Sequence, residues 1–559
     1  MRSLTLFIVF FIFVTNTFAQ QEKPKGRFFG GIESNSCYYL DDSQLGNFDQ
    51  DNPFRSNNYI NINYNYSKFS AGVQIESYEQ NALLNFNPKF KGTNIGTFYL
   101  NYKTQKLDIT IGHFYEQFGS GLTLRTWEDR QLGINNALRG IRVIYNPTDY
   151  LAIKTLYAKQ RSGFDVSEGK IFGFDTELSI SKIFKTEKID LSIGYNFVDR
   201  EEVINFLDPT FKPITAIHGV RFNVSKSAFY ISGEYNFKQK DAIVQNRNIS
   251  NDFVKSGNTT LVNFGYSKKN FGVDATLRRI ENFSFLSERI PQAIDLVSTS
   301  LNFNDKILNF TPALTKQHHS NLANIYVYQA QNRVDFIDQE IMKAGETGGQ
   351  VDYFYTFKKN SAIGGKYGTK IEFNFANWFN LPGSYSFFPA NYKTEFLGRG
   401  TKYFSDYNLE IRKKLTKSFH SSLSYVNQNY NKKWLEGGEL VKTNIVAAEG
   451  TYSLTNQQSF RLEAEHLWTK QDNKNWAATT AEYSFNKKWS FYATDLYNYG
   501  NKDPKKQVHF YNLGATYRNT ATRVSLNYGR QRGGLVCVGG VCRFVPQSTG
   551  LSLSMNTSF

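Results

Sequence analysis

Strict alternation of apolar and polar residues is the feature that most constrains how this chain folds. Between residues 59 and 66, isoleucine and tyrosine occupy the even positions, and asparagine occupies 61, 63 and 65. Segments 107–111, 189–197, 229–237 and 523–528 repeat the alternation. Because successive side chains of a strand point to opposite faces, each segment predicts a strand with one apolar and one polar face. About ten residues is also the length that a tilted strand needs to cross a membrane.

Short polar turns separate these segments at a regular spacing. They fall at eleven sites, namely 67–68, 104–106, 146–149, 185–187, 225–227, 268–270, 358–360, 416–418, 455–457, 486–488 and 518–520. Most lie about 30 to 43 residues apart, which fits hairpins with a tight turn at one end and a longer loop at the other. A soluble β-sandwich shares the alternation, so the spacing distinguishes the two folds. We therefore predict an all-β fold, a large single-chain transmembrane antiparallel up-and-down β-barrel of about 24 strands, within a range of 20 to 26.

The N-terminus predicts export from the cell. Met1-Arg2-Ser3 is a short positive region, residues 4–14 are apolar, and Thr17-Phe18-Ala19 before Gln20 matches a signal-peptidase site. The alternative is a membrane anchor, but residues 4–14 are too short to span a bilayer and no Cys follows the cleavage site to carry a lipid. We expect residues 1–19 to be a cleaved signal peptide and the mature chain to be an integral protein of the bacterial outer membrane.

Composition and charge agree with this class. No apolar run reaches the roughly 18 residues of a membrane helix, and the mean hydropathy of −0.47 argues against a helical membrane protein. Phe, Tyr and Trp make up 16% of the chain, which favours pleated strands and suits a membrane interface. The net charge of +16 is spread along the sequence and is not gathered in one stripe, so we expect no nucleic-acid partner.

A single barrel domain is expected to occupy residues 20–559, because no linker or low-complexity stretch divides them. Because strand-like sequence begins near Arg27 and runs to Phe559, we expect neither an N-terminal plug nor a C-terminal peptidoglycan-binding domain. The alternation of apolar and polar residues, which we call strand phase, is lost between residues 285 and 350. Since the lumen of so wide a barrel is filled by protein or by water, that segment is the candidate for a constriction or an inserted loop.

Aromatic residues mark one edge of the predicted apolar band. Those at or just after a short turn are Phe69, Tyr150, Phe271, Phe419 and Trp489. We expect them to form an interface girdle, although filling hairpin cores is the alternative. The chain ends on an alternating segment whose last residue, Phe559, resembles the last-strand signal that the barrel assembly machinery reads in outer-membrane proteins.

Strand phase also predicts which charged side chains face the lumen. They are Asp108, Arg142, Asp190, Arg221, Glu234, Asp274, Arg278, Glu372, Arg461, Glu463, Glu465 and Arg523. Their mixed sign indicates a hydrated interior without a preference for anions or cations. The charged segment 125–130 is either an ion-paired loop that folds inward and narrows the lumen or a solvated loop held by local salt bridges.

Cys537 and Cys542 bracket Val-Gly-Gly-Val in the final hairpin, and two glycines make a favourable two-residue turn. In an exported protein this spacing predicts a disulfide; a metal site is the weaker alternative, because no His and no second Cys pair lies nearby. Cys37 is expected to be a free, partly buried thiol.

We expect no catalytic, cofactor-binding or metal-binding residue, and hence no enzyme. The adjacent His318 and His319 would point to opposite faces of a strand and make a poor shared metal site. No H-E-x-x-H or G-x-S-x-G occurs, and Gly119-Ser120-Gly121 is closer to a flexible loop than to a nucleophile elbow. A catalytic group assembled only by folding is the remaining alternative.

Five stretches carry a family resemblance: FYEQFGSG at 114–121, EDRQLG at 128–133, TGGQVD at 347–352, GGKYG at 364–368 and CVGGVCR at 537–543. Together with the Phe/Tyr/Asn/Lys-rich composition, they resemble an outer-membrane barrel family of the Bacteroidota whose function is unsettled. The resemblance implies the location and the fold, and almost nothing about activity.

Two functions remain open at this stage. The first is a porin-like channel for small hydrophilic solutes, or a wide barrel closed by its own loops. The second is a non-enzymatic accessory subunit of an outer-membrane machine for protein assembly, secretion or surface-lipoprotein handling. Expected partners are the lipid bilayer and lipopolysaccharide, the barrel assembly machinery during biogenesis, and other outer-membrane proteins or lipoproteins.

Overall fold

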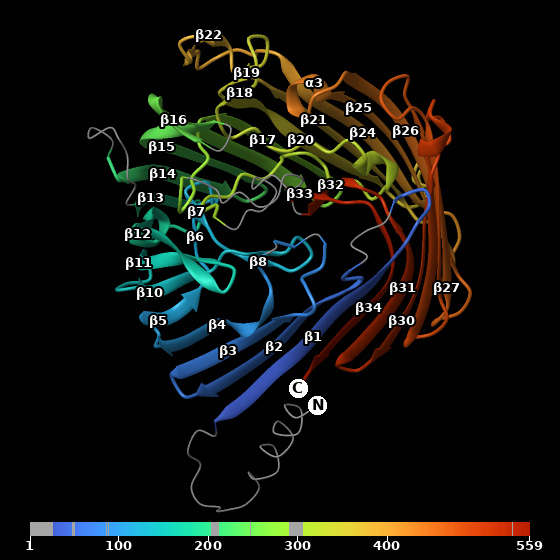
Figure 1. Cartoon of the computed structure of the whole chain (residues 1–559), viewed down its shortest axis with the longest axis horizontal. Coiled ribbons are helices and arrows are strands. Elements are labelled where there is room, and N and C mark those ends of the chain that lie inside the picture. The colour runs from blue at the N-terminus through green and yellow to red at the C-terminus, as the bar shows by residue number, and fades with distance from the viewer. Residues whose placement is uncertain are drawn as a thin grey trace, which may run out of the picture.

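The computed structural model describes residues 26–46, 51–84, 86–87, 89–202, 212–245, 248–289, 306–538 and 540–559, so the predicted signal peptide lies outside the described residues. Twenty-four antiparallel strands form one sheet that closes on itself, as predicted (Figure 1). In chain order they are β1 (Arg27–Leu40), β2 (Phe54–Tyr66), β3 (Phe69–Tyr78), β4 (Gly92–Lys103), β5 (Leu107–Phe114), β10 (Leu138–Tyr145), β11 (Leu151–Ser162), β12 (Asp165–Ser179), β13 (Asp190–Glu201), β14 (Ile214–Lys226), β15 (Phe229–Gln245), β16 (Asn248–Lys268), β17 (Phe271–Glu281), β20 (Gly345–Phe357), β21 (Thr369–Phe379), β24 (Lys402–Lys414), β25 (Phe419–Asn431), β26 (Leu440–Ser453), β27 (Ser459–Trp468), β28 (Trp476–Ser484), β29 (Trp489–Tyr497), β30 (His509–Asn519), β31 (Thr522–Gln531) and β34 (Ser548–Ser558).

The first and last strands complete the ring. β1 pairs with β2 on one side and with β34 on the other, in a register that runs from Gly31 opposite Ser558 to Leu40 opposite Thr549. The backbone groups of Gly30 and Phe559 exchange two further hydrogen bonds of 3.0 Å. Closure leaves the sheet without an open edge, which is what a strand-built membrane protein requires.

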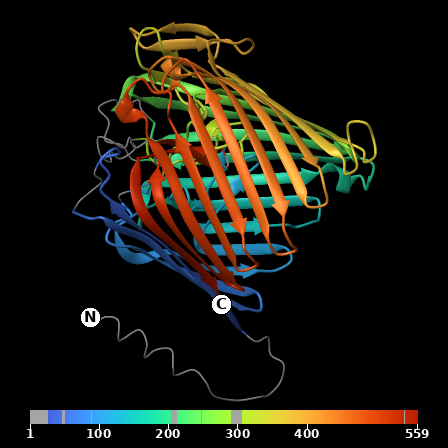
Figure 2. The same cartoon turned by 90° about the vertical axis from the view of Figure 1, so that its right-hand side faces the viewer.

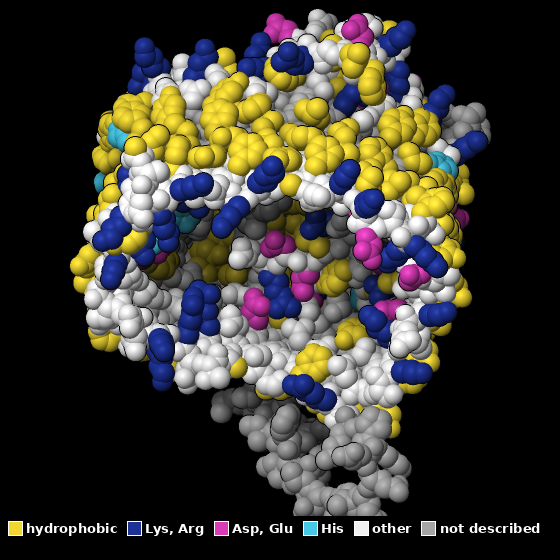
Figure 3. Space-filling view, turned by 180° about the vertical axis from the view of Figure 1, so that it is seen from behind, with side chains coloured by type: hydrophobic (Ala, Val, Ile, Leu, Met, Phe, Trp, Pro, Cys, Tyr) yellow, Lys and Arg dark blue, Asp and Glu magenta, His cyan; other side chains and the backbone are white. Residues whose placement is uncertain are grey.

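All eleven predicted turns join consecutive strands at one end of the barrel. Some contain only two residues, and Ser67, Ser227 and Thr520 then adopt the left-handed φ of 54°, 53° and 52° that such tight hairpins need. From this end the hollow of the barrel is rimmed by Lys and Arg side chains (Figure 3). Figure 2 shows the strands from the side, tilted between the short-turn end and the end with the longer loops.

An apolar belt covers the outside of the wall (Figure 3). Side chains that a soluble protein would bury are exposed there, for example Leu100 at 51%, Val220 at 53% and Leu277 at 61%. Wall residues of the opposite phase, such as Asn196 on β13 and Asn236 on β15, are fully buried in the interior. This arrangement, apolar outside and polar inside, identifies a barrel of the outer-membrane type.

Four of the five predicted girdle aromatics lie against aromatic rings of the adjacent strands, and the fifth, Tyr150, is 37% exposed. Ring centroids are 4.9 Å apart for Phe69 and Tyr102, 4.9 Å for Trp489 and Tyr517, and 6.5 Å for Phe419 and Tyr452. Phe271 lies 5.4 Å from Tyr353. Their side chains are exposed or half-buried, as an interface position requires.

Shorter elements lie between the strands, mostly at the end with the longer loops. They are β6 (Gln117–Phe118), β7 (Leu124–Arg125), β8 (Glu128–Asp129), β9 (Ile134–Asn135), α2 (Ile180–Ile183), η2 (Leu322–Asn324), β18 (Asp335–Phe336), β19 (Met342–Lys343), β22 (Gly383–Ser386), β23 (Asn391–Thr394), α3 (Lys432–Leu435), η3 (Pro504–Lys506), β32 (Gly534–Val538) and β33 (Val541–Val545). None of the helices in the described residues has the length and apolar character needed to span a bilayer.

Candidate functional site

Three loops fold into the lumen and contact one another, and we call them together the plug. They are residues 115–137, the described residues of 282–344, and residues 532–547. Backbone hydrogen bonds of 2.8 Å join Arg125 to Leu308 and Phe310 to Gly121, so the first loop pairs with the second. Ala313 donates a bond of 2.8 Å to Gly540 of the third loop. The described part of the predicted constriction is therefore tied to the other two loops, although its β18–β19 hairpin carries exposed residues such as Ile337, at 52%. β20 begins at Gly345.

A buried carboxylate anchors the plug to β20. Glu346 is fully buried, accepts from Arg278 at 2.5 Å, and accepts from Tyr328 and from the backbone amide of Gln331 at 2.5 and 2.7 Å. Burial, and then the negative charge of Glu346, raise the pKa of Tyr328 well above its usual range, so the phenol stays protonated and donates. Its ring stacks on those of Trp378 and Phe404, which are cross-strand partners on the wall.

A second anchor joins the start of the long loop to the wall three strands away, on β15. Arg289 is buried and donates to Asp241 of β15 at 2.6 Å and to Glu202 at 3.1 Å. Asp241 also accepts from Arg200 of β13 at 3.0 Å. Two guanidinium groups therefore share one wall carboxylate, and each charge is compensated inside the barrel.

A third anchor holds residues 316–322. His318 lies 2.8 Å from Asp406 of β24, and both side chains are buried. Glu465 of β27 accepts from the backbone amides of Asn321 and Leu322 at 3.0 and 2.9 Å, which caps the first turn of η2. The wall carboxylate adds to a local cap, since Ser320 accepts from the backbone amide of Ala323 at 3.2 Å.

The loop at 115–137 folds inward, in agreement with the first of the two alternatives for its charged segment. Arg130 lies 2.6 Å from Glu33 of β1 and 3.1 Å from Glu128, and its guanidinium stacks over the ring of Tyr59 at 4.1 Å. Burial acts to lower the pKa of Arg130, but the two carboxylates outweigh it and hold the pKa above its ordinary value. Glu116 of the same loop binds Lys154 of the wall at 2.9 Å.

Cys537 and Cys542 form a disulfide that closes the small hairpin of β32 and β33. This hairpin is an insertion between β31 and β34, and it belongs to the plug instead of spanning the membrane. Gln317 donates to the carbonyl of Cys537 at 3.3 Å, and Arg543 donates to the carbonyl of Leu132. Cys37 is a free, buried thiol on β1.

Seven residues predicted to face the lumen contact the plug. Glu465 binds Asn321 and Leu322 as described above, and Arg461 and Glu463 lie against His319. Glu234 accepts from the amide of Ser120 at 2.9 Å, Arg278 donates to the carbonyl of Pro312 at 2.7 Å, and Glu372 lies 3.8 Å from Lys316. Arg142 donates to the carbonyl of Tyr115 at 3.3 Å.

The other residues predicted to face the lumen bind wall neighbours or line open space. Asp108 lies 3.4 Å from Arg142, and Arg221 lies 2.6 Å from Asp175. Tyr230 donates to Asp274. Asp190 is exposed near a short turn, and Arg523 lines a cavity of 680 Å³ between the plug and the wall.

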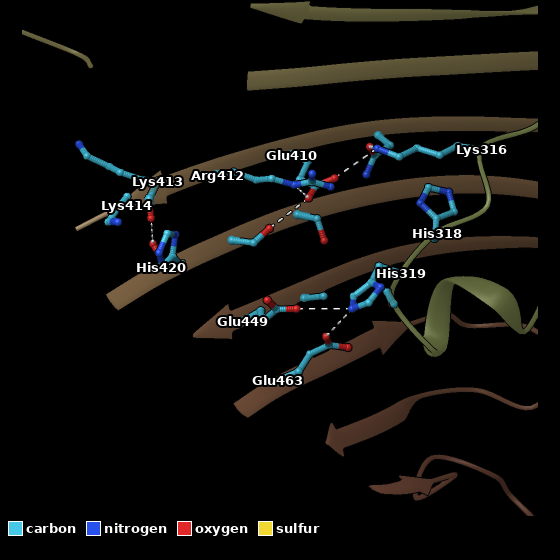
Figure 4. Close-up of a pocket in the computed structure, with 16 residues that line it drawn as sticks. Lys316, His318, His319, Glu410, Arg412, Lys413, Lys414, His420, Glu449 and Glu463 are labelled. Carbon is cyan, nitrogen blue, oxygen red and sulfur yellow. Dashed lines mark hydrogen bonds and ion pairs between the residues drawn. The ribbon is translucent and has the colours of Figure 1, made fainter. Parts of the chain in front are cut away.

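A cavity of 430 Å³ reaches from the plug toward the short-turn end (Figure 4). The plug contributes Lys316 and residues 318–320 to its lining, and the wall contributes β24 to β27. His319 points into this space and lies 3.5 Å from Glu449 and 3.8 Å from Glu463. His318 and His319 therefore reach different partners.

His319, Glu449 and Glu463 are close enough to share a cation. However, Arg461 lies among them, 2.9 Å from Glu449 and 2.7 Å from His319, and also pairs with Glu463. Its guanidinium already supplies the positive charge that would neutralise the carboxylates. The cluster is therefore explained as an ion-pair network on the cavity wall.

Sequence reasoning missed the acidic wall residues Glu346, Asp241 and Asp406. Asp406 has the same strand phase as Glu410 and would have been found by extending that strand. Asp241 lies beyond an irregularity in the pairing of β15 with β16, and Glu346 lies in the stretch where phase is lost, so no periodic signal marks either.

Solved structures with a similar arrangement include a siderophore receptor, PirA from Pseudomonas aeruginosa, with 9% identity and a TM-score of 0.41 over 96% of this chain and 81% of that one. The copper transporter OprC has 8% identity and a TM-score of 0.39 over 97% and 82% of the two chains. The P pilus usher PapC translocation pore has 9% identity and a TM-score of 0.35 over 95% and 99%. At these values the likeness concerns the barrel fold alone. No curated protein matches the sequence. The model of a family of unknown function, DUF6029, matches residues 1–559, and the chain belongs to that family.

Proposed function

We propose that this DUF6029 protein is a non-enzymatic outer-membrane barrel that is closed by its own loops and works as a subunit of a larger assembly. The observation that carries the proposal is the plug, whose three anchors tie it to the wall strands β15, β20 and β24 through buried charged groups. Removing one partner from a buried ion pair costs about 3–5 kcal/mol. A plug held by several such ties stays in place without a signal from outside.

Partners in this proposal follow from the location of the barrel. The bilayer and lipopolysaccharide surround the apolar belt, and the barrel assembly machinery inserts the chain. Other outer-membrane proteins or lipoproteins would contact the longer loops, while the wall serves as a rigid scaffold.

The second candidate is a porin-like channel for small hydrophilic solutes that opens when the plug moves. The polar cavity of 430 Å³ on the short-turn side favours it, because water and small solutes can enter the barrel that far. In this alternative the channel is closed while the anchors hold the plug, and it opens when they break.

Planar-bilayer recording of the purified full chain, together with native mass spectrometry after gentle extraction, separates the two candidates. Insertion is verified by heat-modifiable gel migration of the same sample. The subunit proposal expects electrical silence and at least one partner in fixed stoichiometry. Stable stepwise currents from a protein that extracts without partners would overturn it in favour of the channel.

A further inference from the structure

The hairpin of β22 and β23 lies outside the barrel wall. It projects beyond the ring of strands near β16 and β17 in Figure 1 and runs above the wall in the side view of Figure 2. Its inner side packs on the ends of those strands and of the plug, since Tyr392 contacts Phe253 and Phe336. Lys255 of β16 also donates to the carbonyl of Tyr392 at 3.1 Å.

The polar contacts of this hairpin fix its height along the wall. Arg278 points into the lumen, so its neighbour Arg279 points outward, where it donates to Thr394 at 3.0 Å and to the carbonyl of Glu395. Thr394 donates in turn to the outward Glu281 at 2.8 Å. On the same strand and face, Leu277 is 61% exposed and belongs to the apolar belt. Two residues of strand span about 7 Å, so the hairpin begins where the belt ends.

The outer side of the hairpin and of the segment that follows it carries large apolar side chains. Phe388 is 77% exposed, Phe396 60% and Leu397 79%, which are among the highest values for apolar residues in the described chain. They contact little of the protein itself. An apolar surface of this kind, continuous with a belt that faces lipid, favours lipid as its occupant.

Basic side chains accompany these apolar ones. Lys393, Arg399 and Lys402 are exposed, and Glu395 is the one exposed acid among residues 393–402. Arg399 and Lys402 lie over the ring of Phe379 at 5.3 and 5.6 Å, on the outer face of β21. Aromatic rings with cations at the edge of an apolar band suit a headgroup region that carries phosphate.

We propose that residues 383–402 form an anchor in the outer leaflet, where Phe388, Phe396 and Leu397 contact acyl chains and Lys393, Arg399 and Lys402 bind the phosphates of an anionic glycolipid. The anchor fastens one side of the barrel to the lipid that surrounds it. This inference does not depend on whether the barrel conducts.

Spin labels test the apolar part. Single cysteines replace Phe388, Leu553 or Lys505 in a Cys37→Ser background, and the labelled full chain is reconstituted in vesicles of phosphatidylcholine with purified lipopolysaccharide. Leu553 is a belt residue and Lys505 an exposed loop residue, so labels at these two positions give the accessibilities expected in lipid and in water. We expect the label at 388 to be accessible to oxygen and shielded from a water-soluble nickel complex, as at 553. Accessibility like that at 505 would overturn the proposal, as would shielding that appears only with a co-purified protein.

Charge removal tests the phosphate part. The variant Lys393→Gln/Arg399→Gln/Lys402→Gln should bind purified lipopolysaccharide more weakly in native mass spectrometry, by about fivefold for each lost cation. The matched control removes three lysines of one short turn, Lys358→Gln/Lys359→Gln/Lys366→Gln, and should bind as the unaltered protein does. Equal losses in both variants would show non-specific attraction, and no loss in the first would show no glycolipid site; either result contradicts the proposal.

Discussion

The phenol of Tyr328 lies 2.5 Å from the carboxylate of Glu346, and both side chains are fully buried inside a barrel that its strand number alone would leave open. The first residue belongs to a loop and the second to the wall. Through this contact the plug is part of the folded core. Taking the plug out of the lumen therefore costs the free energy of unfolding buried structure.

Loss of the acidic anchors should open the barrel. Asp241→Asn with Glu346→Gln removes the charges that hold Arg289 and Arg278, at a cost of about 3–5 kcal/mol for each buried pair. We expect stepwise planar-bilayer currents from this double variant where the parent protein is silent. Glu482→Gln, which alters a half-exposed wall carboxylate, serves as the control. If the double variant inserts normally and stays silent, these anchors do not hold the plug.

Breaking the disulfide should loosen the plug locally. Cys537→Ser/Cys542→Ser reopens a loop of six residues, whose closure is worth about 2 kcal/mol by loop entropy. Amide hydrogen exchange should rise in residues 533–546 and 313–317, and strands β1 and β34 should keep their protection. Faster exchange throughout the wall would contradict this, because it would assign the disulfide a role in barrel stability.

Acid should release the first long loop from the seam. Burial acts to raise the pKa of Asp42, but hydrogen bonds from Thr549, Gln44 and Arg530 outweigh it and hold the pKa below its usual 3.8. A depressed folded pKa contributes stability above 3.8 that is lost as pH falls below that value. We expect thermal stability to fall as pH drops below about 4 by a step that Asp42→Asn lacks. At neutral pH the variant should be about 1 kcal/mol less stable. Parallel pH profiles of the two proteins would refute the assignment.

Adjacent positions on the last strand should respond oppositely to the same substitution. Leu553 is 45% exposed on the lipid face, and Ser554 lines the 680 Å³ cavity inside. Leu553→Arg should lower the free energy of unfolding in vesicles by about 2–4 kcal/mol, and Ser554→Arg by much less. Equal effects in urea titrations would mean that lipid does not face the alternating side chains.

The last side chain should matter for assembly more than for the finished ring. Phe559→Ala keeps both backbone hydrogen bonds to Gly30 and removes only the ring. We expect less heat-modifiable protein in membranes at equal synthesis. Phe485→Ala, at the end of another strand with 48% exposure, is the control. An unchanged yield for Phe559→Ala would exclude the predicted assembly signal.

Strand positions could be read from the sequence because lipid and water impose period two on every wall segment. The alternation at 59–66 predicts β2, and turns such as Ser67-Lys68 fix where hairpins reverse. The plug could not be read in this way, because its residues pack among themselves and against the wall without any repeat. Tyr328 and Glu346 are an aromatic and an acid in an aperiodic stretch, and only folding brings them together. The hairpin outside the wall was missed for the same reason, since it packs on a surface that strand phase assigns to lipid.

The seam between β1 and β34 sets an order on biogenesis. β34, which pairs with β1, is the last barrel strand to be synthesised. The ring therefore cannot close until the loops between the other strands have been made. The loop that precedes β20 is synthesised after thirteen of the strands that enclose it and before the other eleven. Once β1 and β34 have paired, the closed barrel encloses that loop, and the loop can leave the lumen only through one of the two ends of the barrel.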